Sequence, residues 1–481
     1  MYIINKKIIL LVLGMEDIDI LIKNYFEKAV QDMQDLIKIN SQYDRNTVDE
    51  TCPFGAGAAE CLNKFISIAE SDGFTVKNIE NYAGYAELGE GELIGILSHL
   101  DVVPAGNENL WKYPPFAAEI HDNKLYGRGA IDDKGPLIAV YTALKILKDS
   151  GIKFNKRFRI IAGCDEETSM RCLKRYNETE EIPSFSFSPD ANFPAVYAEK
   201  GQMQITMNRD FPLQGFEPVK LLGLTCGERV NVVPDTAYAY FAGDTAKIKR
   251  QLEEIAGDDL EIDYYQQDYL QVKATGKSAH AMNPEKGINA MYKLLRYLAH
   301  PSLDYGSWEL MLWIRQVAFL LTDDCDGRNF NINCSDDISG NLTINLGIVR
   351  YKTEDLTLKF DIRYPVTIKS SKMENKIHNL AEKMMMLTQI SKHIPPLFVD
   401  KNNPYLKELL KAYQEVTSDY SEPIAIGGRT YCTMMPNSLS FGANFKDDEE
   451  LAHQNNEYID LDKFKKLIKI YIKALINLNN M

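Results

Sequence analysis

Two continuous apolar runs stand out in the first half of the chain. Residues 93–97 end two positions before His99, and residues 158–162 form the second run. Such runs are typical of central strands that are covered on both faces of a sheet. Between them, the apolar residues of segment 137–147 recur at helical spacing directly after Pro136, which predicts a helix. This strand, helix and strand order predicts an α/β sheet.

The pattern changes from about residue 201. Residues 270–275, 341–348 and 355–362 alternate between apolar and polar, which indicates half-solvated antiparallel strands. Helical stretches near 287–300 and 372–387 accompany them. The middle of the chain is therefore predicted to be an α+β domain with helices on one face of its sheet.

Helical and strand-like patterns return after Pro395 and Pro396. Residues 405–417 predict a helix, residues 439–441 a short apolar strand, and residues 461–478 a closing amphipathic helix.

The composition narrows the class of protein. A chain of 481 residues is too long for one hydrophobic core, and 45% apolar and 25% charged residues are ordinary for a globular enzyme. The net charge of -14 argues against a nucleic-acid partner, because neutralising phosphates needs a basic surface. The eight cysteines form no C-x-x-C pair, which favours a cytoplasmic location over a disulfide framework or a zinc ribbon. No run of eighteen apolar residues predicts a membrane span.

The first residues allow two interpretations. Lys6 and Lys7 precede a short apolar run at 8–13, which lacks the length and the A-x-A site of a signal peptide. Met15 then opens an acidic, helix-like stretch at 16–39, so translation starting at Met15 is an alternative to Met1.

Residue types that bind divalent cations recur along the chain in a fixed order: His99, Asp132, Glu167, Asp190 and His453. Imidazole and carboxylate groups suit borderline or hard divalent cations. Most of them follow predicted strands, where open α/β sheets place their chemistry. A ligand in the last tenth of the chain can join the others only if the C-terminal segment folds back onto the N-terminal sheet.

Each of these features has a simpler explanation when taken alone. An isolated His-x-Asp is usually surface chemistry, Glu166 and Glu167 could begin a solvated helix, and Asp132 and Asp133 could cap the helix after Pro136. Agreement of residue type, order and spacing across several segments favours a metal site.

Six segments together resemble a known family. They are S-H-L-D-V-V-P-A-G (98–106), L-Y-G-R-G-A-I-D-D-K-G-P (125–136), D-E-E-T (165–168), S-P-D (188–190), G-K-S-A-H-A (276–281) and L-A-H-Q (451–454). From about Glu16 to the C-terminus the chain resembles the M20 metallopeptidases, in their branch of PepV-like bacterial dipeptidases. The resemblance implies a two-domain α/β protein. Residues 15–198 and 395–481 form a mixed α/β catalytic domain, zinc-aminopeptidase-like with helices on both faces of its sheet, and residues 199–394 an inserted α+β lid with an antiparallel sheet.

By position, the resemblance implies that Asp132 bridges two metal ions. His99 and Asp190 would complete one site, and Glu167 and His453 the other. A bridging carboxylate holds two cations about 3.5–4 Å apart, so that they activate one water and polarise a carbonyl. The implied ions are Zn²⁺ or Mn²⁺, with Co²⁺ also compatible.

The resemblance implies further catalytic roles beside the metal. Glu166 would be the general base that moves a proton from water to the leaving amine. Asp101 is expected to accept the second imidazole N–H of His99 and so fix its tautomer.

Lys134 is expected to contact nearby carboxylates. The Met384, Met385 and Met386 run is predicted to pack in the core.

The lid is expected to supply substrate contacts. His280 would stabilise the oxyanion with help from Asn231, and Arg363 would bind the C-terminal carboxylate of the substrate. Gly428 and Thr430 are also expected to contact the substrate.

The segment around Gly428 departs from the family pattern. Relatives often show G-G-G-T-Y-A-R where this chain has G-G-R-T-Y-C-T at 427–433. Arg429 replaces a glycine, and Thr433 stands where an arginine is expected. The change affects carboxylate recognition, for which Arg429 could supply the missing cation.

The predicted function is a cytoplasmic, metal-dependent dipeptidase acting on short, unblocked dipeptides. One alternative is hydrolysis of N-acyl amino acids, as in aminoacylases or desuccinylases, and another is a catalytically silent metal-binding protein. In the resembled branch an enlarged lid accompanies a monomer whose His280 acts within its own chain, so a monomer is expected.

Overall fold

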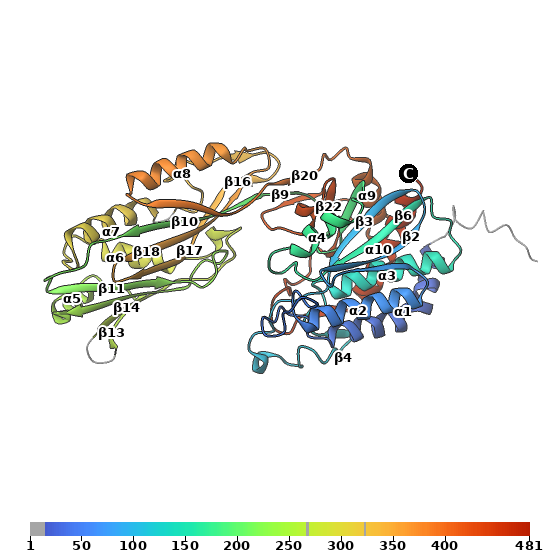
Figure 1. Cartoon of the computed structure of the whole chain (residues 1–481), viewed down its shortest axis with the longest axis horizontal. Coiled ribbons are helices and arrows are strands. Elements are labelled where there is room, and N and C mark those ends of the chain that lie inside the picture. The colour runs from blue at the N-terminus through green and yellow to red at the C-terminus, as the bar shows by residue number, and fades with distance from the viewer. Residues whose placement is uncertain (1–14, 266–268, 322–323) are drawn as a thin grey trace, which may run out of the picture. The chain divides into compact units, whose positions relative to one another are not determined.

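The chain forms two compact units. The computed structural model describes residues 15–265, 269–321 and 324–481, so the predictions for the residues before Met15 lie outside the described residues. Unit 1 consists of Met1–Ala198, Leu397–Ile424 and Arg429–Met481, and unit 2 of Glu199–Pro396 and Ala425–Gly428 (Figure 1). The two units are described separately below.

Unit 1 is built on a nine-stranded mixed sheet. Its strand order is β1-β2-β6-β3-β7-β22-β9-β20, with β21 paired to β9. At the centre, β3 (Glu92–His99) pairs in parallel with β6 (Lys156–Gly163) and β7 (Phe185–Ser188). Every residue of β3 after Glu92 is buried, as its uninterrupted apolar run predicted. The other strands are β1 (Thr75–Ile79), β2 (Ala83–Gly89), β9 (Val196–Glu199), β20 (Leu397–Phe398), β21 (Ile424–Ile426) and β22 (Ser438–Ser440).

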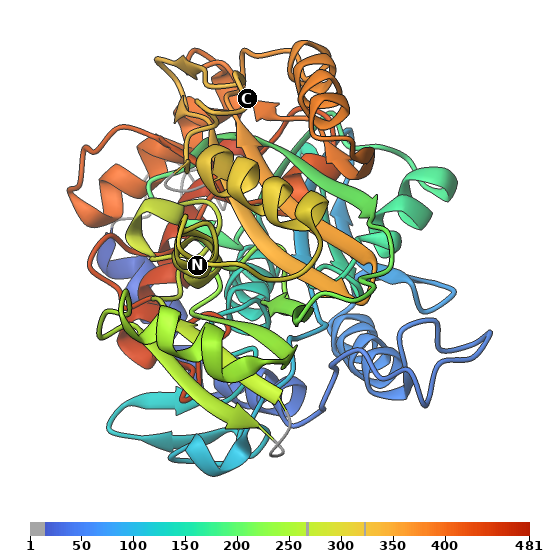
Figure 2. The same ribbon diagram turned by 90° about the vertical axis from the view of Figure 1, so that its left-hand side faces the viewer.

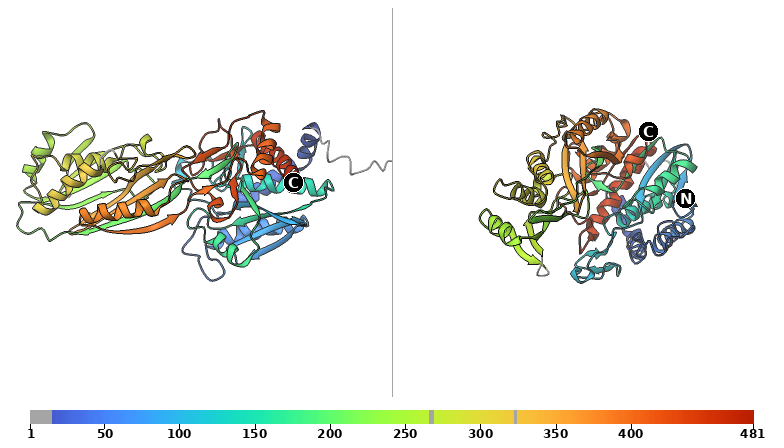
Figure 3. Two further views of the ribbon diagram at one scale, coloured as in Figure 1. Left: turned by 90° about the horizontal axis from the view of Figure 1, so that it is seen from above. Right: turned by 60° about the vertical axis from the view of Figure 1, so that its left-hand side comes forward.

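Helices of unit 1 pack on one another as well as on the sheet. The closing helix α10 (Leu461–Asn479) packs against α3 (Lys134–Asp149) and α9 (Pro404–Thr417) (Figure 3). Its N-cap is Asp460, whose side chain accepts the N–H groups of the next turn. The predicted helices in these three places are confirmed. The remaining helices are α1 (Met15–Ile37), α2 (Ala56–Ser71) and α4 (Arg171–Thr179).

Two short sheets return the C-terminal segment to the N-terminal half of unit 1. β24 (Tyr458–Asp460) pairs with β5 (Lys124–Tyr126), which also pairs with β4 (Glu119–His121). β23 (Ala443–Asn444) pairs with β8 (Ala191–Asn192). The loop between β23 and β24, which carries His453, therefore lies beside the loops that follow the central strands.

Unit 2 is built on an eight-stranded antiparallel sheet in the order β13-β14-β12-β11-β17-β18-β10-β19. Its strands are β10 (Gly201–Asp210), β11 (Val219–Cys226), β12 (Thr236–Gly243), β13 (Leu260–Tyr265), β14 (Tyr269–Thr275), β17 (Thr343–Lys352), β18 (Asp355–Tyr364) and β19 (Leu387–Ile394). Its helices are α5 (Thr245–Glu253), α6 (Ala290–Leu298), α7 (Trp308–Leu321) and α8 (Ser371–Lys383).

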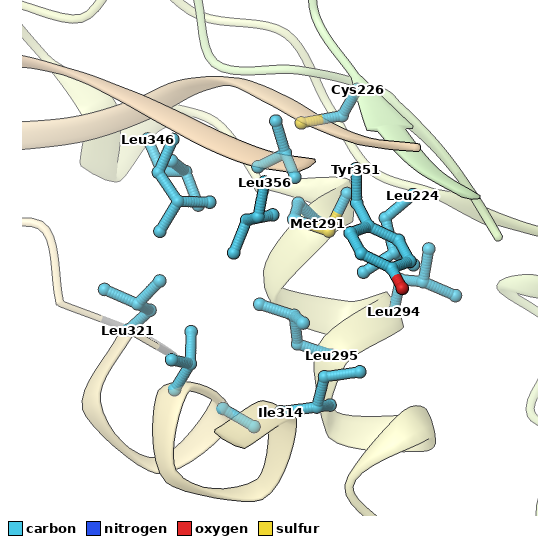
Figure 4. Packing of buried hydrophobic residues seen from close by; sticks show 14 of the residues in the cluster. Leu224, Cys226, Met291, Leu294, Leu295, Ile314, Leu321, Leu346, Tyr351 and Leu356 are labelled. Atoms are coloured by element: carbon cyan, nitrogen blue, oxygen red, sulfur yellow. The ribbon is translucent and has the colours of Figure 1, made fainter. Parts of the chain in front are cut away.

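One buried hydrophobic cluster joins the helices of unit 2 to its sheet. All four helices contribute side chains to this cluster, and Figure 2 shows yellow helices lying over the orange strands. Leu295 of α6 and Ile314 of α7 lie in it with Leu346 and Leu356 of the strands (Figure 4). Because the helices share one core, they cover one face of the sheet. The predicted fold class, α/β with an α+β second unit, is confirmed.

Three details differ from the sequence-based expectations. Helix α8 ends at Lys383 and β19 begins at Leu387, so the helix predicted over 372–387 is too long. Met385 has a φ of 54° and is 64% exposed, while its neighbours Met384 and Met386 are buried. Packing of the methionine run is therefore confirmed for two of its three residues. The sequence pattern does not predict helix α7 or strand β19.

The predicted boundaries place Ala425–Gly428 with residues 395–481, whereas in the structure this segment belongs to unit 2. The N–H of Lys200 donates to the carbonyl of Ile426 at 3.0 Å, and Arg363 donates to the carbonyl of Gly427.

Among the described helices, none has both the length and the apolar character needed to cross a membrane.

Candidate metal centre

The predicted ligands meet at one edge of the central sheet of unit 1. His99 is the last residue of β3, Glu167 follows β6, and Asp190 follows β7. Asp132 lies just before α3, and His453 lies between β23 and β24. Because β3, β6 and β7 are neighbouring parallel strands, their carboxyl ends bring these residues together.

Asp132 lies between two pairs of side chains. His99 Nε2 is 2.9 Å from Asp132 Oδ1 and 3.6 Å from Asp190 Oδ2. His453 Nε2 is 3.1 Å from Asp132 Oδ2 and 3.0 Å from Glu167 Oε1. Ligand atoms of His99, Asp132 and Glu167 all lie within 4.8 Å of one another. One carboxylate therefore faces two imidazoles, and each imidazole is accompanied by a further carboxylate.

The charge of this cluster fits a cation. Burial lowers the pKa of His453, but its bonds to Asp132 and Glu167 outweigh burial and raise the pKa to about 11. In the same way Asp132 and Asp190 hold the pKa of His99 well above its usual value against burial. Three carboxylates thus surround two imidazoles, and divalent cations would neutralise this excess of negative charge. Nitrogen and carboxylate oxygen donors suit zinc and manganese, so these residues fit the implied metal.

Access to the cluster is uneven. The His99 side chain is 1% exposed, whereas that of His453 is 51% exposed. The φ of His453 is 65°, a left-handed conformation that surrounding contacts must hold in place for a residue with a Cβ. Solvent therefore reaches the cluster at His453 and not at His99.

Asp101 supports the cluster differently from the prediction. The Nδ1–H of His99 donates to the main-chain carbonyl of Asp101 at 2.8 Å, and the Asp101 carboxylate lies 3.7 Å from that nitrogen. The carboxylate instead accepts the main-chain N–H groups of Glu166 and Glu167 at 3.1 and 3.0 Å. The tautomer of His99 is thus fixed by a carbonyl, which leaves Nε2 facing Asp132, and the carboxylate orders the Glu166 loop.

Glu166 precedes the predicted ligand Glu167. Among the described residues it forms none of the close contacts that join the two histidines to the three carboxylates. Burial raises the pKa of Glu166 well above its usual value, and the charges of Glu167 and Asp190 add to this, while His99 opposes it. A raised pKa makes the carboxylate a stronger base, which suits the role of a general base.

Lys134 does not contact carboxylates as expected. It is fully buried, and its Nζ donates to the main-chain carbonyls of Leu36 and Ile39 at 2.9 and 3.0 Å. Its role is to connect α3 to the end of α1.

The candidates from the lid lie in unit 2. Asn231 and His280 are close in space, because Val232 and His280 form a β-bridge and the N–H of Ala281 donates to the Asn231 carbonyl at 2.9 Å. The exposed His280 accepts the N–H of Met282 on Nδ1 at 3.1 Å. In the neutral ring, the proton is then on Nε2.

Arg363 is buried and already engaged. Its Nε donates to Asp361 Oδ1 at 2.6 Å, its Nη2 to Asp361 Oδ2 at 3.4 Å, and its Nη1 to the Gly427 carbonyl at 3.0 Å. Gln202 also donates to Asp361, at 2.7 Å. Within the described part of the chain these bonds use three of the five guanidinium N–H groups, which leaves two for a ligand.

The two remaining candidates differ in their surroundings. Gly428 belongs to unit 2 and Thr430 to unit 1. The Thr430 hydroxyl lies 3.0 Å from that of Ser440 and accepts the Cys432 N–H at 3.2 Å, so it caps the short helix η4 (Tyr431–Met434). Arg429 Nη1 lies 3.2 Å from the Met170 sulfur. Substrate contact by Gly428 and Thr430 stays a prediction.

A family model described as Peptidase family M20/M25/M40 matches residues 95–477. The chain belongs to this family. Proteins of Staphylococcus aureus strains MW2 and USA300, both named "Putative dipeptidase", are 34% identical to it over 473 and 478 residues. Each alignment covers 95% of this chain and 98% of the relative.

Solved structures of the same fold support the two-unit architecture. Human carnosine dipeptidase 1 superposes with a TM-score of 0.58 and 14% identity, over 97% of this chain and 99% of that one. The di-peptidase Dug1p of Saccharomyces cerevisiae gives a TM-score of 0.59 at 14% identity, with the same coverage. Membership of the M20 family makes this protein a hydrolase of a metal-dependent family.

Two residues of this M20 site were missed by the sequence interpretation. Asp133 is fully buried and accepts the Ser98 hydroxyl and, at 3.2 Å, the His99 N–H. It does so instead of capping α3, for which the described residues show no side-chain cap. Glu457, also fully buried, bonds to the Asp132 loop. Closeness in sequence to Asp132 and His453 was the only available signal for either residue.

Proposed function

We propose that this protein is a dipeptidase that uses two divalent metal ions, Zn²⁺ or Mn²⁺ with Co²⁺ also compatible, to hydrolyse the peptide bond of short, unblocked dipeptides. Membership of a peptidase family supports the reaction class. Full-length similarity to proteins named as dipeptidases supports the size of the substrate.

One observation carries the metal assignment. The two carboxylate oxygens of Asp132 each face a different histidine, at 2.9 Å for His99 and 3.1 Å for His453. Asp132 would bridge the ions, His99 and Asp190 would hold one, and Glu167 and His453 the other. When bound, the ions would lower the pKa of a water toward neutrality and polarise the scissile carbonyl.

Glu166 is the proposed general base. Its carboxylate would take a proton from the attacking water and deliver it to the nitrogen of the leaving amine. The N–H groups of Glu166 and Glu167 donate to the Asp101 carboxylate, which would hold the base and the neighbouring ligand in fixed positions.

Unit 2 is proposed to recognise the substrate. His280, with Nδ1 accepting the Met282 N–H, can present Nε2–H to the developing oxyanion, and Asn231 would assist. Arg363 would bind the substrate carboxylate through its two remaining N–H groups. Gly428 of unit 2 and the main chain of Thr430 in unit 1 would complete the contacts.

The experiment compares free and blocked substrates. Chelator-stripped enzyme is resupplied with Zn²⁺ or Mn²⁺ and given a panel of dipeptides, their N-acetyl forms and N-acetyl amino acids, with ninhydrin detection of new amines. Metal-dependent cleavage of free dipeptides alone is expected. Cleavage of the acylated compounds would instead favour an aminoacylase, and lack of turnover on the whole panel a silent metal-binding protein.

We further propose that the enzyme is a cytoplasmic monomer. The cysteine pattern supports the location, and the length of unit 2, residues 199–396, supports a lid that serves its own chain. Light scattering should give the mass of one chain, and a dimer that loses activity on dilution would contradict the proposal.

A further inference from the structure

A buried carboxylate outside the ligand set holds the loop of the proposed bridging residue. Glu457 is fully buried. Its Oε1 accepts the main-chain N–H of Ile131 at 3.0 Å and that of Asp132 at 3.3 Å. The position of the Asp132 main chain is therefore set by a side chain that lies 325 residues further along the chain.

The other oxygen of Glu457 forms a buried ion pair. Arg128 Nη1 donates to Glu457 Oε2 at 2.6 Å, and both side chains are at most 2% exposed. The guanidinium also donates to the Pro104 carbonyl at 3.4 Å and lies 5.2 Å from the Trp111 ring. The contacts with Pro104 and Trp111 thus hold the guanidinium of Arg128 in place, so that it fixes the position of the Glu457 carboxylate.

Main-chain bonds extend this connection in both directions. The N–H of Gly127 donates to the Glu457 carbonyl at 3.0 Å, and β24 begins at the next residue. Asp132 follows Arg128 by four positions, and His453 precedes Glu457 by four. The pair therefore fastens together the two short segments whose ends carry Asp132 and His453, 3.1 Å apart.

We infer that Glu457 and Arg128 are positioning residues that set the distance between Asp132 and His453 and thereby the affinity of the centre for metal. The inference rests on the proposed function. It gives the pair a role beyond stability, because a buried ion pair by itself is weak evidence for a stabilising role, whereas this pair bonds directly to the main chain of a ligand.

The main test is the variant Glu457→Gln. The amide keeps an oxygen for the two N–H groups but removes the charge that faces Arg128. Competition with a chromogenic chelator for Zn²⁺ or Mn²⁺ on stripped protein should show about 10–100-fold weaker metal affinity, the usual effect of losing a group that orients ligands. The rise in Tm on adding a fixed metal concentration should shrink accordingly.

A matched control separates positioning from stability. Arg159 and Glu87 form another largely buried pair in unit 1, with Nη2 and Oε2 2.6 Å apart, between β6 and β2. Glu87→Gln should lower Tm with and without metal equally and leave metal affinity unchanged. Metal binding by Glu457→Gln as tight as that of Glu87→Gln would overturn the inference.

A second variant guards against misfolding. Arg128→Lys keeps the positive charge but loses the planar fork, so it should also weaken metal binding relative to Glu87→Gln, and wild-type affinity would count against the inference. Failure of the wild-type protein itself to bind metal would refute the proposed function instead.

Discussion

In unit 1 the proposed ligands come from separate segments of the chain. In unit 2 the β-bridge between Val232 and His280 brings Asn231 close to His280, and Arg363 is paired with a residue of its own strand. The metal centre is connected through main-chain bonds to the buried carboxylates of Asp101 and Glu457. The candidate residues of unit 2 are held by partners within unit 2. Substitutions in unit 2 should therefore change turnover and leave metal binding intact, while those around the centre should change both unless they touch the base alone.

Glu166→Ala should have the largest effect on activity. Removal of the general base should lower kcat roughly 10²–10⁴-fold, while metal content stays near wild type because Glu166 is not a proposed ligand. Steady-state kinetics with elemental analysis tests both parts. Retained turnover would eliminate Glu166 as the base.

His280→Ala tests the unit 2 side of the comparison. Loss of an oxyanion donor typically lowers kcat about 10²–10³-fold, and metal affinity should not change. His378→Ala, a change at an exposed histidine of α8, is the matched control and should behave like wild type. Loss of metal by His280→Ala would contradict the expectation that substitutions in unit 2 leave metal binding intact.

Asp101→Asn sharpens the account of the centre. The amide cannot accept both N–H groups of Glu166 and Glu167 as the carboxylate does, so activity should fall about 10–100-fold. Because the bond from His99 Nδ1 goes to the main-chain carbonyl, the His99 tautomer should persist. NMR of the imidazole nitrogens would check this. A changed tautomer would show that the Asp101 carboxylate, and not the carbonyl, fixes the tautomer of His99.

Thr430→Val should have the smallest effect. Loss of the hydroxyl that caps η4 should reduce the free energy of unfolding by about 1 kcal/mol, measured by denaturant titration, with KM nearly unchanged. Thr430→Ser retains the hydroxyl and serves as the control. A large rise in KM for the valine variant alone would assign the hydroxyl to the substrate.

The sequence predicted the central strands and the side chains that gather at their ends, because both depend on local signals. The uninterrupted apolar run before His99 requires a buried strand, and imidazole and carboxylate residues at strand ends have few other uses in combination. The predicted length of α8 was wrong because methionine suits a helix, a turn and a core equally. Nothing in the residue types therefore marks the left-handed conformation of Met385.

Partners inside the metal centre were less predictable. Whether His99 donates to the carboxylate or to the carbonyl of Asp101 depends on the path of one loop, which residue types do not encode. Lys134 and Glu457 bond mainly to main-chain groups, and any residue offers those. Such contacts become visible only when distant segments are placed in three dimensions.

The return of the C-terminal segment through β23 and β24 has a consequence for the order of events during synthesis. The nascent chain can form the central strands early, but it has no complete set of proposed ligands until His453 has been translated, and no ion pair with Arg128 until Glu457 has followed. A chain released before that point would lack the centre. Hydrolytic activity would thereby be reserved for a polypeptide whose synthesis has passed His453.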